Sequence, residues 1–293
     1  MRGRNFCVLS LLTVLAVAGE PGAKGYQVRL VDATQVKATV KFELYRDYLI
    51  VAPGKAGKWK GLHLLIDTGA TPTVLDRQLA QKLGLVEEPA SITLVNGKMA
   101  AGRATLASLE FGPMRRDNLP VMVEDLSFFQ KSLPVRIDAV IGLDVLGSAF
   151  EIDYLSRKIY FGPLPPMANS LPLRIEAGLP VVDAQLNHVS LHLLIDTGAS
   201  SLILFEPTTL RPASPTKISD VQQPPNAIGE FGNKQVWLRT LRLGEIEFGR
   251  EPAFLIRAPG DRGRDFDGMM SPAALGITKV AIDLERGVMA FSR

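Results

Sequence analysis

The chain has 293 residues, of which 46% are hydrophobic and 22% charged, so it is neither a disordered chain nor a polyelectrolyte. Its length leaves one large or two modest domains open. The net charge of +3, from 33 basic and 30 acidic residues, does not indicate a phosphate-binding surface. The single cysteine excludes intrachain disulfides, iron–sulfur clusters and cysteine-rich zinc sites.

Residues 1–18 have the pattern of an export signal. Arg2 and Arg4 give a basic start, and Phe6 to Ala18 is an almost unbroken apolar run. At ~1.5 Å per residue the run spans about 20 Å, short of the ~30 Å hydrocarbon core, so a cleaved signal is favoured over a membrane anchor. No later apolar segment is long enough to span a bilayer. We therefore expect an exported mature chain without cysteine and without a membrane span.

Short apolar runs separated by glycine and proline predict strands joined by turns in the first half. Asn96-Gly97 is a hairpin signal, because both residues accept positive φ. The one convincing helix is expected from Asp76, as N-cap, to Gly84, as the stop. The expected strands lie at 39–52, 62–66, 92–95 and 104–111.

The sequence contains a long internal repeat. Residues 62–70 and 191–199 both read LHLLIDTGA, which places Asp67 and Asp196 in equivalent positions 129 residues apart. Further matching pieces follow at offsets of 129 to 132 residues, so each copy is the size of a domain.

A cluster of glycine and proline separates the two copies. We predict an N-terminal lobe at 19–162, a linker at 163–170 and a C-terminal lobe at 171–293. In the second copy, Pro207 to Pro225 replaces the helix with an expected surface loop. Short helices are expected near 144–148 and 272–275, and the whole chain is predicted to be all-β with a few short helices.

Each Asp-Thr-Gly follows a strand that is apolar at nearly every position. One such turn alone is a weak signal. Two buried carboxylates from equivalent lobes, however, would meet across a pseudo-twofold axis. Like charges ~3 Å apart cannot both ionise, so the pair shares one proton and provides a base beside an acid.

On these residues the chain resembles aspartic proteases of the retropepsin/pepsin type, close to the bacterial retropepsin-like proteins with two copies in one chain. The matching segments are 66–71 and 195–200, together with Val140-Ile141-Gly142. The resemblance implies two homologous pepsin/retropepsin-like β-barrel lobes with pseudo-twofold symmetry. It also leads us to expect a periplasmic or secreted protein in a bacterial setting.

The resemblance assigns Asp67 and Asp196 as the catalytic dyad of an aspartic-type endopeptidase. These carboxylates would activate a water molecule for attack on a peptide bond, with no covalent intermediate. The expected partner is a peptide or protein substrate. No cofactor, metal or nucleic acid is expected, and the chain is expected to be a monomer.

The resemblance also implies which residues support the dyad. Thr68 and Thr197 would cross-link the two catalytic loops, and Gly69 and Gly198 would allow the tight turns. Two turns would act as flaps over the substrate. The flap residues carried over are Asn96, Gly97, Gly229 and Gly232.

Two departures from the family pattern bear on activity. Ser271 replaces the motif glycine of the second copy, which puts the support of that catalytic loop in doubt. Ala70 and Ala199 stand where pepsins usually carry Ser or Thr. Without those hydroxyl donors the carboxylates ionise less readily, so we predict an optimum less acidic than that of a pepsin.

Several other features have less specific interpretations. His63 and His192 are interpreted as structural, and Asp138 and Asp267 as turn or cap residues. Lysines 55, 58 and 60 around Trp59 could suggest nucleic acid, but a solvated hairpin loop is favoured, because no second basic-aromatic element accompanies them.

Two alternative functions remain open. A noncatalytic peptide-binding protein would keep the cleft without turnover, and a self-processing or narrowly specific protease would cut only one native partner.

Overall fold

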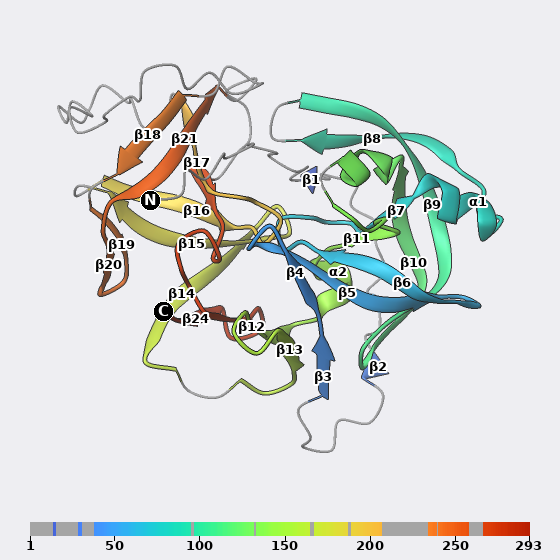
Figure 1. Cartoon of the computed structure of the whole chain (residues 1–293), viewed down its shortest axis with the longest axis horizontal. Helices are drawn as coiled ribbons and strands as arrows, with labels where there is room; N and C mark the ends of the chain where they lie inside the picture. Colours follow the sequence, from blue (N-terminus) through green and yellow to red (C-terminus); the bar gives the residue numbers. More distant parts are fainter. Residues whose placement is uncertain are drawn as a thin grey trace.

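The computed structural model confirms the all-β prediction: strands dominate and the helices are few and short (Figure 1). It describes residues 14–15, 29–30, 38–94, 97–131, 133–164, 167–186, 189–206, 234–238, 240–257 and 266–293. The strands form one ten-stranded and one fourteen-stranded sheet, which occupy opposite sides of the molecule. Of the helices in these ranges, none is long and apolar enough to cross a bilayer.

The ten-stranded sheet includes β6, the strand that precedes the first Asp-Thr-Gly motif. Its central strands lie in the order β7-β11-β6-β5. β11 runs parallel to β6, and the other two neighbouring pairs are antiparallel. β1, which lies inside the predicted export signal, pairs with β8 at the edge of this sheet. The strands of the sheet are β1 (Val14–Leu15), β2 (Arg29–Leu30), β4 (Glu43–Tyr45), β5 (Leu49–Ala56), β6 (Trp59–Ile66), β7 (Val74–Asp76), β8 (Glu88–Leu94), β9 (Gly97–Phe111), β10 (Met114–Glu124) and β11 (Ala139–Ile141).

The fourteen-stranded sheet contains the second motif, and it also takes in strands from the first half of the chain. β3 pairs with β13, and β12 pairs with β23, so strands from both halves of the chain lie in one sheet. Its strands are β3 (Ala38–Lys41), β12 (Ala149–Asp153), β13 (Lys158–Phe161), β14 (Asn169–Glu176), β15 (Leu179–Leu186), β16 (Val189–Ile195), β17 (Leu202–Glu206), β18 (Lys234–Leu238), β19 (Leu241–Leu243), β20 (Ile246–Phe248), β21 (Glu251–Arg257), β22 (Gly268–Met270), β23 (Lys279–Asp283) and β24 (Val288–Ser292).

We call residues 43–146 the N-terminal lobe, residues 179–270 the C-terminal lobe, and strands β3, β12, β13, β14, β23 and β24 the shared sheet. The nine residues of β12 and β13, which belong to the predicted N-terminal lobe, thus pair in the shared sheet. β14 begins at Asn169, within the predicted linker.

The predicted helix is present as α1 (Arg77–Lys82). The Asp76 carboxylate accepts hydrogen bonds from the N–H groups of Gln78 and Leu79, which makes Asp76 the N-cap as expected. The left-handed φ of Gly84, +69°, ends the segment. The predicted helix at 144–148 appears as α2 (Leu143–Leu146), and a 3₁₀ helix, η1 (Leu126–Lys131), precedes it. The helix expected at 272–275 is wrong: these residues form turns only.

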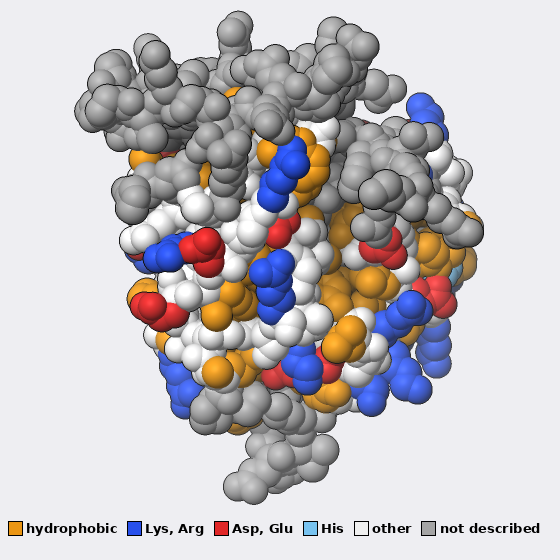
Figure 2. Space-filling view, turned by 60° about the vertical axis from the view of Figure 1, so that its left-hand side comes forward, with side chains coloured by type: hydrophobic (Ala, Val, Ile, Leu, Met, Phe, Trp, Pro, Cys, Tyr) orange, Lys and Arg blue, Asp and Glu red, His pale blue; other side chains and the backbone are white. Residues whose placement is uncertain are grey.

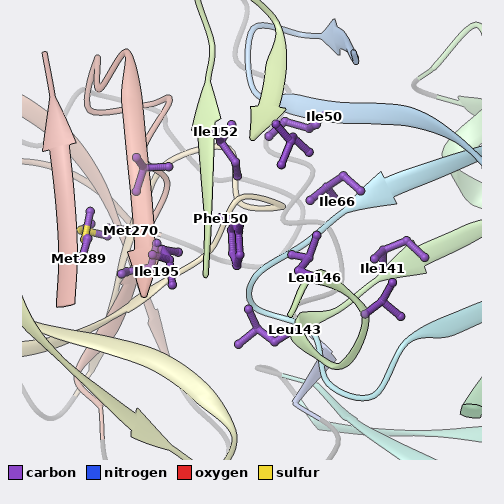
Figure 3. Close-up of a cluster of buried hydrophobic side chains, with 14 of the residues drawn as sticks. Ile50, Ile66, Ile141, Leu143, Leu146, Phe150, Ile152, Ile195, Met270 and Met289 are labelled. Atoms are coloured by element: carbon purple, nitrogen blue, oxygen red, sulfur yellow. The ribbon is translucent and has the colours of Figure 1, made fainter. Parts of the chain in front are cut away.

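The largest hydrophobic cluster extends across both lobes (Figure 3). Ile50, Ile66 and Ile141 come from the N-terminal lobe, and Ile195 and Met270 from the C-terminal lobe. The side chains of β12, including Phe150, lie between these two groups. Because one core is shared, the strand ends that carry the two motifs are held in a fixed relation.

Candidate active site

Both Asp-Thr-Gly motifs follow a central buried strand with the same neighbours. In the N-terminal lobe β6 pairs in parallel with β11, and in the C-terminal lobe β16 pairs in parallel with β22. The Asp67 N–H donates to the Ile141 carbonyl, and the Asp196 N–H donates to the Met270 carbonyl, each at 3.0 Å. The identical strand sequences therefore end in identical backbone geometry.

The two carboxyl groups lie together in the interior. Asp67 is 2% exposed and Asp196 is 0% exposed. A Cβ atom added to Gly69 would lie 2.8 Å from Asp196 Cγ, and one added to Gly198 would lie 2.7 Å from Asp67 Oδ2. Each lobe's glycine thus faces the other lobe's carboxyl group at a distance that no side chain allows. This close approach is why the motif needs glycine in both copies.

The threonines cross-link the two catalytic loops reciprocally. The Thr68 N–H donates to Thr197 Oγ1 at 3.0 Å, and the Thr197 N–H donates to Thr68 Oγ1 at 3.1 Å. The hydroxyl of Thr68 donates to the Ile195 carbonyl at 2.7 Å, and that of Thr197 to the Ile66 carbonyl at 3.0 Å. These four bonds, all buried, hold the two motifs in register.

Burial and mutual repulsion control the ionisation of the pair. Desolvation raises the pKa of Asp67 well above its usual value, and the adjacent Asp196 charge and a hydrogen bond with Asp196 raise it further. The N–H groups of Gly69 and Gly198 lower this pKa, but by less. The pair therefore retains a proton at a pH where an ordinary aspartate is ionised. Such a pair offers a proton donor and a proton acceptor side by side.

A polar network that the sequence analysis missed supports the first loop. Asp144, in α2, accepts hydrogen bonds from the Thr73 N–H at 2.9 Å and the Thr73 hydroxyl at 2.8 Å. The Gly142 N–H in turn donates to Thr73 Oγ1 at 3.2 Å. Buried Arg116 donates to the carbonyls of Asp144 and Val145. Burial raises the pKa of the Asp144 carboxyl group, and the Thr73 hydrogen bonds and the Arg116 charge oppose that rise.

The second loop has apolar residues at the equivalent positions. Thr73 corresponds to Leu202 and Asp144 to Ala273, both at an offset of 129 residues. Arg116 pairs with Leu109 across the β9–β10 ladder, just as Phe248 pairs with Leu241 across β19–β20. Leu202 and Phe248 are almost completely buried. The signal in the sequence was that Thr73, Asp144 and Arg116 stand where the second repeat has apolar residues, which a comparison of the two repeats position by position would have shown.

The motif glycine and its serine counterpart also differ in surroundings. A Cβ atom on Gly142 would lie 2.3 Å from the Ala70 carbonyl oxygen, so the first loop has no room for a side chain there. Ser271 is fully buried at the equivalent place, and its hydroxyl accepts a bond from the Ala274 N–H at 3.4 Å. The second loop therefore accommodates a side chain that the first excludes.

The aspartates before the apolar motif accept hydrogen bonds from the backbone of the histidine residues. The Asp138 carboxylate accepts from the His63 N–H at 2.9 Å, and the Asp267 carboxylate accepts from the His192 N–H at 2.8 Å. Each bond joins the strand that precedes an Asp-Thr-Gly motif to the residue just before the neighbouring parallel strand. Within the described ranges, no group of three or more His, Cys, Asp or Glu residues is placed to hold a metal ion.

The flap predictions are only partly covered by the structure. β8 and β9 form the expected hairpin, with Leu94 opposite Gly97, and Asn96 in its turn lies outside the described residues. Gly229 and Gly232 of the second flap also lie outside the described residues.

Comparisons with known proteins agree with part of this site. Solved structures with similar chains include the basic 7S globulin from soybean, at 13% identity and a TM-score of 0.48, covering 88% of this chain and 94% of that one. Conglutin gamma, a basic 7S globulin from lupine seeds, gives 16% identity and a TM-score of 0.47, covering 87% of this chain and 94% of that one. The search of curated proteins gives no match. A family model described as aspartyl protease matches residues 53–145, the segment that contains the first Asp-Thr-Gly motif and its Gly142 support.

Proposed function

We propose that this chain is an aspartic endopeptidase that hydrolyses peptide bonds with a water molecule held between Asp67 and Asp196. The observation that carries the proposal is the buried carboxyl pair, in which the pKa of Asp67 is raised by burial and by its partner. The family match over residues 53–145 supports the same class of enzyme.

The chemistry needs only groups that this site contains. One carboxylate takes a proton from water as the water oxygen attacks the carbonyl carbon, and the other carboxyl group gives its proton to the carbonyl oxygen. The resulting diol collapses as the C–N bond breaks. One carboxyl group gives its proton to the leaving nitrogen, and the other carboxylate takes a proton from a diol hydroxyl, which yields a carboxylic acid and restores the singly protonated pair. The threonine cross-links keep both carboxyl groups oriented through these steps.

The wider setting is also a proposal. An export signal at residues 1–18 would deliver the protein to the periplasm or the exterior, where it would act on peptide or protein substrates as a monomer.

The test is digestion of unfolded casein by the purified protein between pH 2 and pH 8. We expect cleavage that a statine-type inhibitor blocks, with an optimum above pH 3. Asp67→Asn and Asp196→Asn should each reduce the rate at least about 100-fold, because each removes an acid–base group. The matched control is Asp117→Asn, at a position whose side chain is 55% exposed and pairs with Arg115 on the surface.

The outcomes separate the candidate functions. A maximum at pH 2–3 would contradict the expected effect of Ala70 and Ala199. Intact casein at every pH, together with tight binding of the inhibitor, would favour a noncatalytic peptide-binding protein. Cleavage of a native partner but not of casein would favour a narrowly specific protease.

A further inference from the structure

The far end of the N-terminal lobe carries an exposed tryptophan surrounded by lysines. Trp59 is 36% exposed. The ammonium groups of Lys58 and Lys82 lie 5.8 and 5.7 Å from its ring centroid. Lys60 is exposed two residues from Lys58 on the same hairpin. We call Lys58, Trp59, Lys60 and Lys82 the Trp59 patch. Lys82 comes from α1, so the fold adds a lysine that the sequence around Trp59 does not contain.

The patch is built on packed secondary structure. Ala56 and Trp59 face each other across the turn that joins β5 and β6. A Cβ atom on Gly57, in that turn, would lie 3.5 Å from Leu83, the C-cap of α1, so the turn packs against the helix end. Figure 1 shows α1 and the β5–β6 turn at the same outer edge of the molecule. The patch is therefore presented on a supported surface.

Among the residues that the structure describes, none of the three lysines of the patch has an ion-pair partner, whereas the neighbouring Lys55 pairs with Glu110 at 2.8 Å. The carboxylates that follow α1, Glu87 and Glu88, pair with Arg77 and Arg103. Figure 2 shows basic and acidic side chains on one face of the molecule. An apolar side chain, Val86, is 84% exposed close to the end of α1.

We infer that the Trp59 patch is a docking site for the surface of an anionic phospholipid bilayer. The indole ring is suited to the headgroup region, where one edge is apolar and the other wet. Lysine stems can follow the ring while their ammonium groups reach lipid phosphates. A single tryptophan without an aromatic row does not suit nucleic acid, whose bases need successive stacking partners.

The position of the patch leaves the candidate active site open. β6 runs from Trp59 to Ile66, and at ~3.3 Å per residue this places the patch about 23 Å along the strand from the residue before Asp67. A protein docked through this end would hold its carboxyl pair away from the bilayer. The inference does not depend on the proposed protease activity.

The test measures co-sedimentation with vesicles of phosphatidylglycerol and phosphatidylcholine, and with vesicles of phosphatidylcholine alone. The protein is purified after export and its N-terminus is determined, so that the apolar segment at 1–18 does not contribute. We expect binding to the anionic vesicles that weakens as salt is raised, and at least tenfold weaker binding to the neutral ones.

Variants assign the binding to the patch. Lys58→Ala, Lys60→Ala and Lys82→Ala combined should weaken binding roughly 100-fold, about fivefold for each lysine. Trp59→Ala should weaken it several-fold. The matched control combines Lys41→Ala, Lys98→Ala and Lys131→Ala, which removes the same charge from exposed positions elsewhere and should change binding less than twofold. Near-ultraviolet circular dichroism checks that all variants fold.

Three results would overturn the inference. The first is failure of the wild-type protein to sediment with anionic vesicles. The second is an equal loss of affinity in the patch and control variants, which would show a general effect of charge. The third is equal binding to neutral vesicles, which would leave the lysines without a role. Binding to an acidic protein without binding to anionic vesicles would also overturn the inference, because the patch would then recognise a protein instead of a bilayer.

Discussion

The two lobes hold the same catalytic sequence in place by different means. In the N-terminal lobe, Thr73, Asp144 and Arg116 form a buried polar network beneath the loop of Asp67. In the C-terminal lobe, Leu202, Ala273 and Phe248 occupy the equivalent positions, and their side chains contain no polar group. The difference indicates that the residues at these three positions depend on one another. Removing one member of a buried polar network leaves its partners unpaired, whereas replacing all of the members with apolar residues restores packing.

The strongest test of this comparison moves one polar residue into the apolar lobe. Phe248→Arg places a guanidinium group in a fully buried site near Arg293, whose own guanidinium lies 4.8 Å from the Phe248 ring centroid. Ala273 supplies no carboxylate there. We expect a loss of about 4 kcal/mol or more in the free energy of unfolding, measured with urea. Arg116→Phe is the matched change in the other lobe, and it should cost less, because Asp144 keeps its Thr73 bonds. A smaller loss for Phe248→Arg than for Arg116→Phe would contradict the comparison.

The second test dismantles the polar network. Asp144→Ala leaves the Thr73 N–H and hydroxyl without their carboxylate acceptor and removes the negative charge near the buried Arg116, which keeps its hydrogen bonds to backbone carbonyls. The change should cost about 2–4 kcal/mol. Adding Arg116→Phe to this variant gives the N-terminal lobe two of the three apolar residues of the other lobe. The double variant should therefore lose at least about 1 kcal/mol less than the sum of the single losses. A double-mutant cycle from urea unfolding measures this coupling, and additive losses would show that the two residues act independently.

The third test exchanges the residues at the loop position where the lobes differ. Gly142→Ser would force a side chain against the Ala70 carbonyl oxygen, and should cost about 2 kcal/mol and lower the proposed proteolysis at least tenfold. Ser271→Gly removes a side chain that its lobe accommodates, and should cost about 0.5–1 kcal/mol with little change in rate. Equal costs for the two exchanges, measured by thermal unfolding and casein digestion, would mean that the loops do not differ in space.

The smallest expected effect concerns pH. Because the folded-state pKa of Asp67 is raised, folding takes up a proton, and the stability from this group is present at low pH and lost as pH rises through the raised pKa. Asp67→Asn removes this dependence. Its Tm should exceed that of the wild type by about 2–6 °C at pH 7 and by little at pH 4. A Tm difference that does not grow with pH would show that Asp67 ionises normally in the folded protein.

Local features of the fold could be predicted from the sequence because their causes are local. The Asp76 cap, the stop at Gly84, the hairpin before Gly97 and the buried strands before each Asp-Thr-Gly all depend on residues a few positions apart. The helix expected at 272–275 was wrong, because the apolar residues there form turns that complete the second loop.

Long-range features could not be predicted in the same way. β3 lies at the start of the first half but pairs with β13 in the shared sheet, which no periodicity within either segment indicates. The Thr73–Asp144 bonds join residues 71 positions apart, and Asp144 alone is typical of an ordinary first-turn helix residue.

The sequence by itself determined that two equivalent Asp-Thr-Gly turns end two apolar strands, since identical residues have identical local preferences. Only the tertiary structure decided that these turns meet, with each glycine against the other lobe's carboxyl group and each threonine bonded across the interface. It also decided that Lys82 reaches Trp59. The physical reason is the same in both cases: burial, charge coupling and hydrogen-bond partners are set by groups that are distant in the chain and adjacent only after folding.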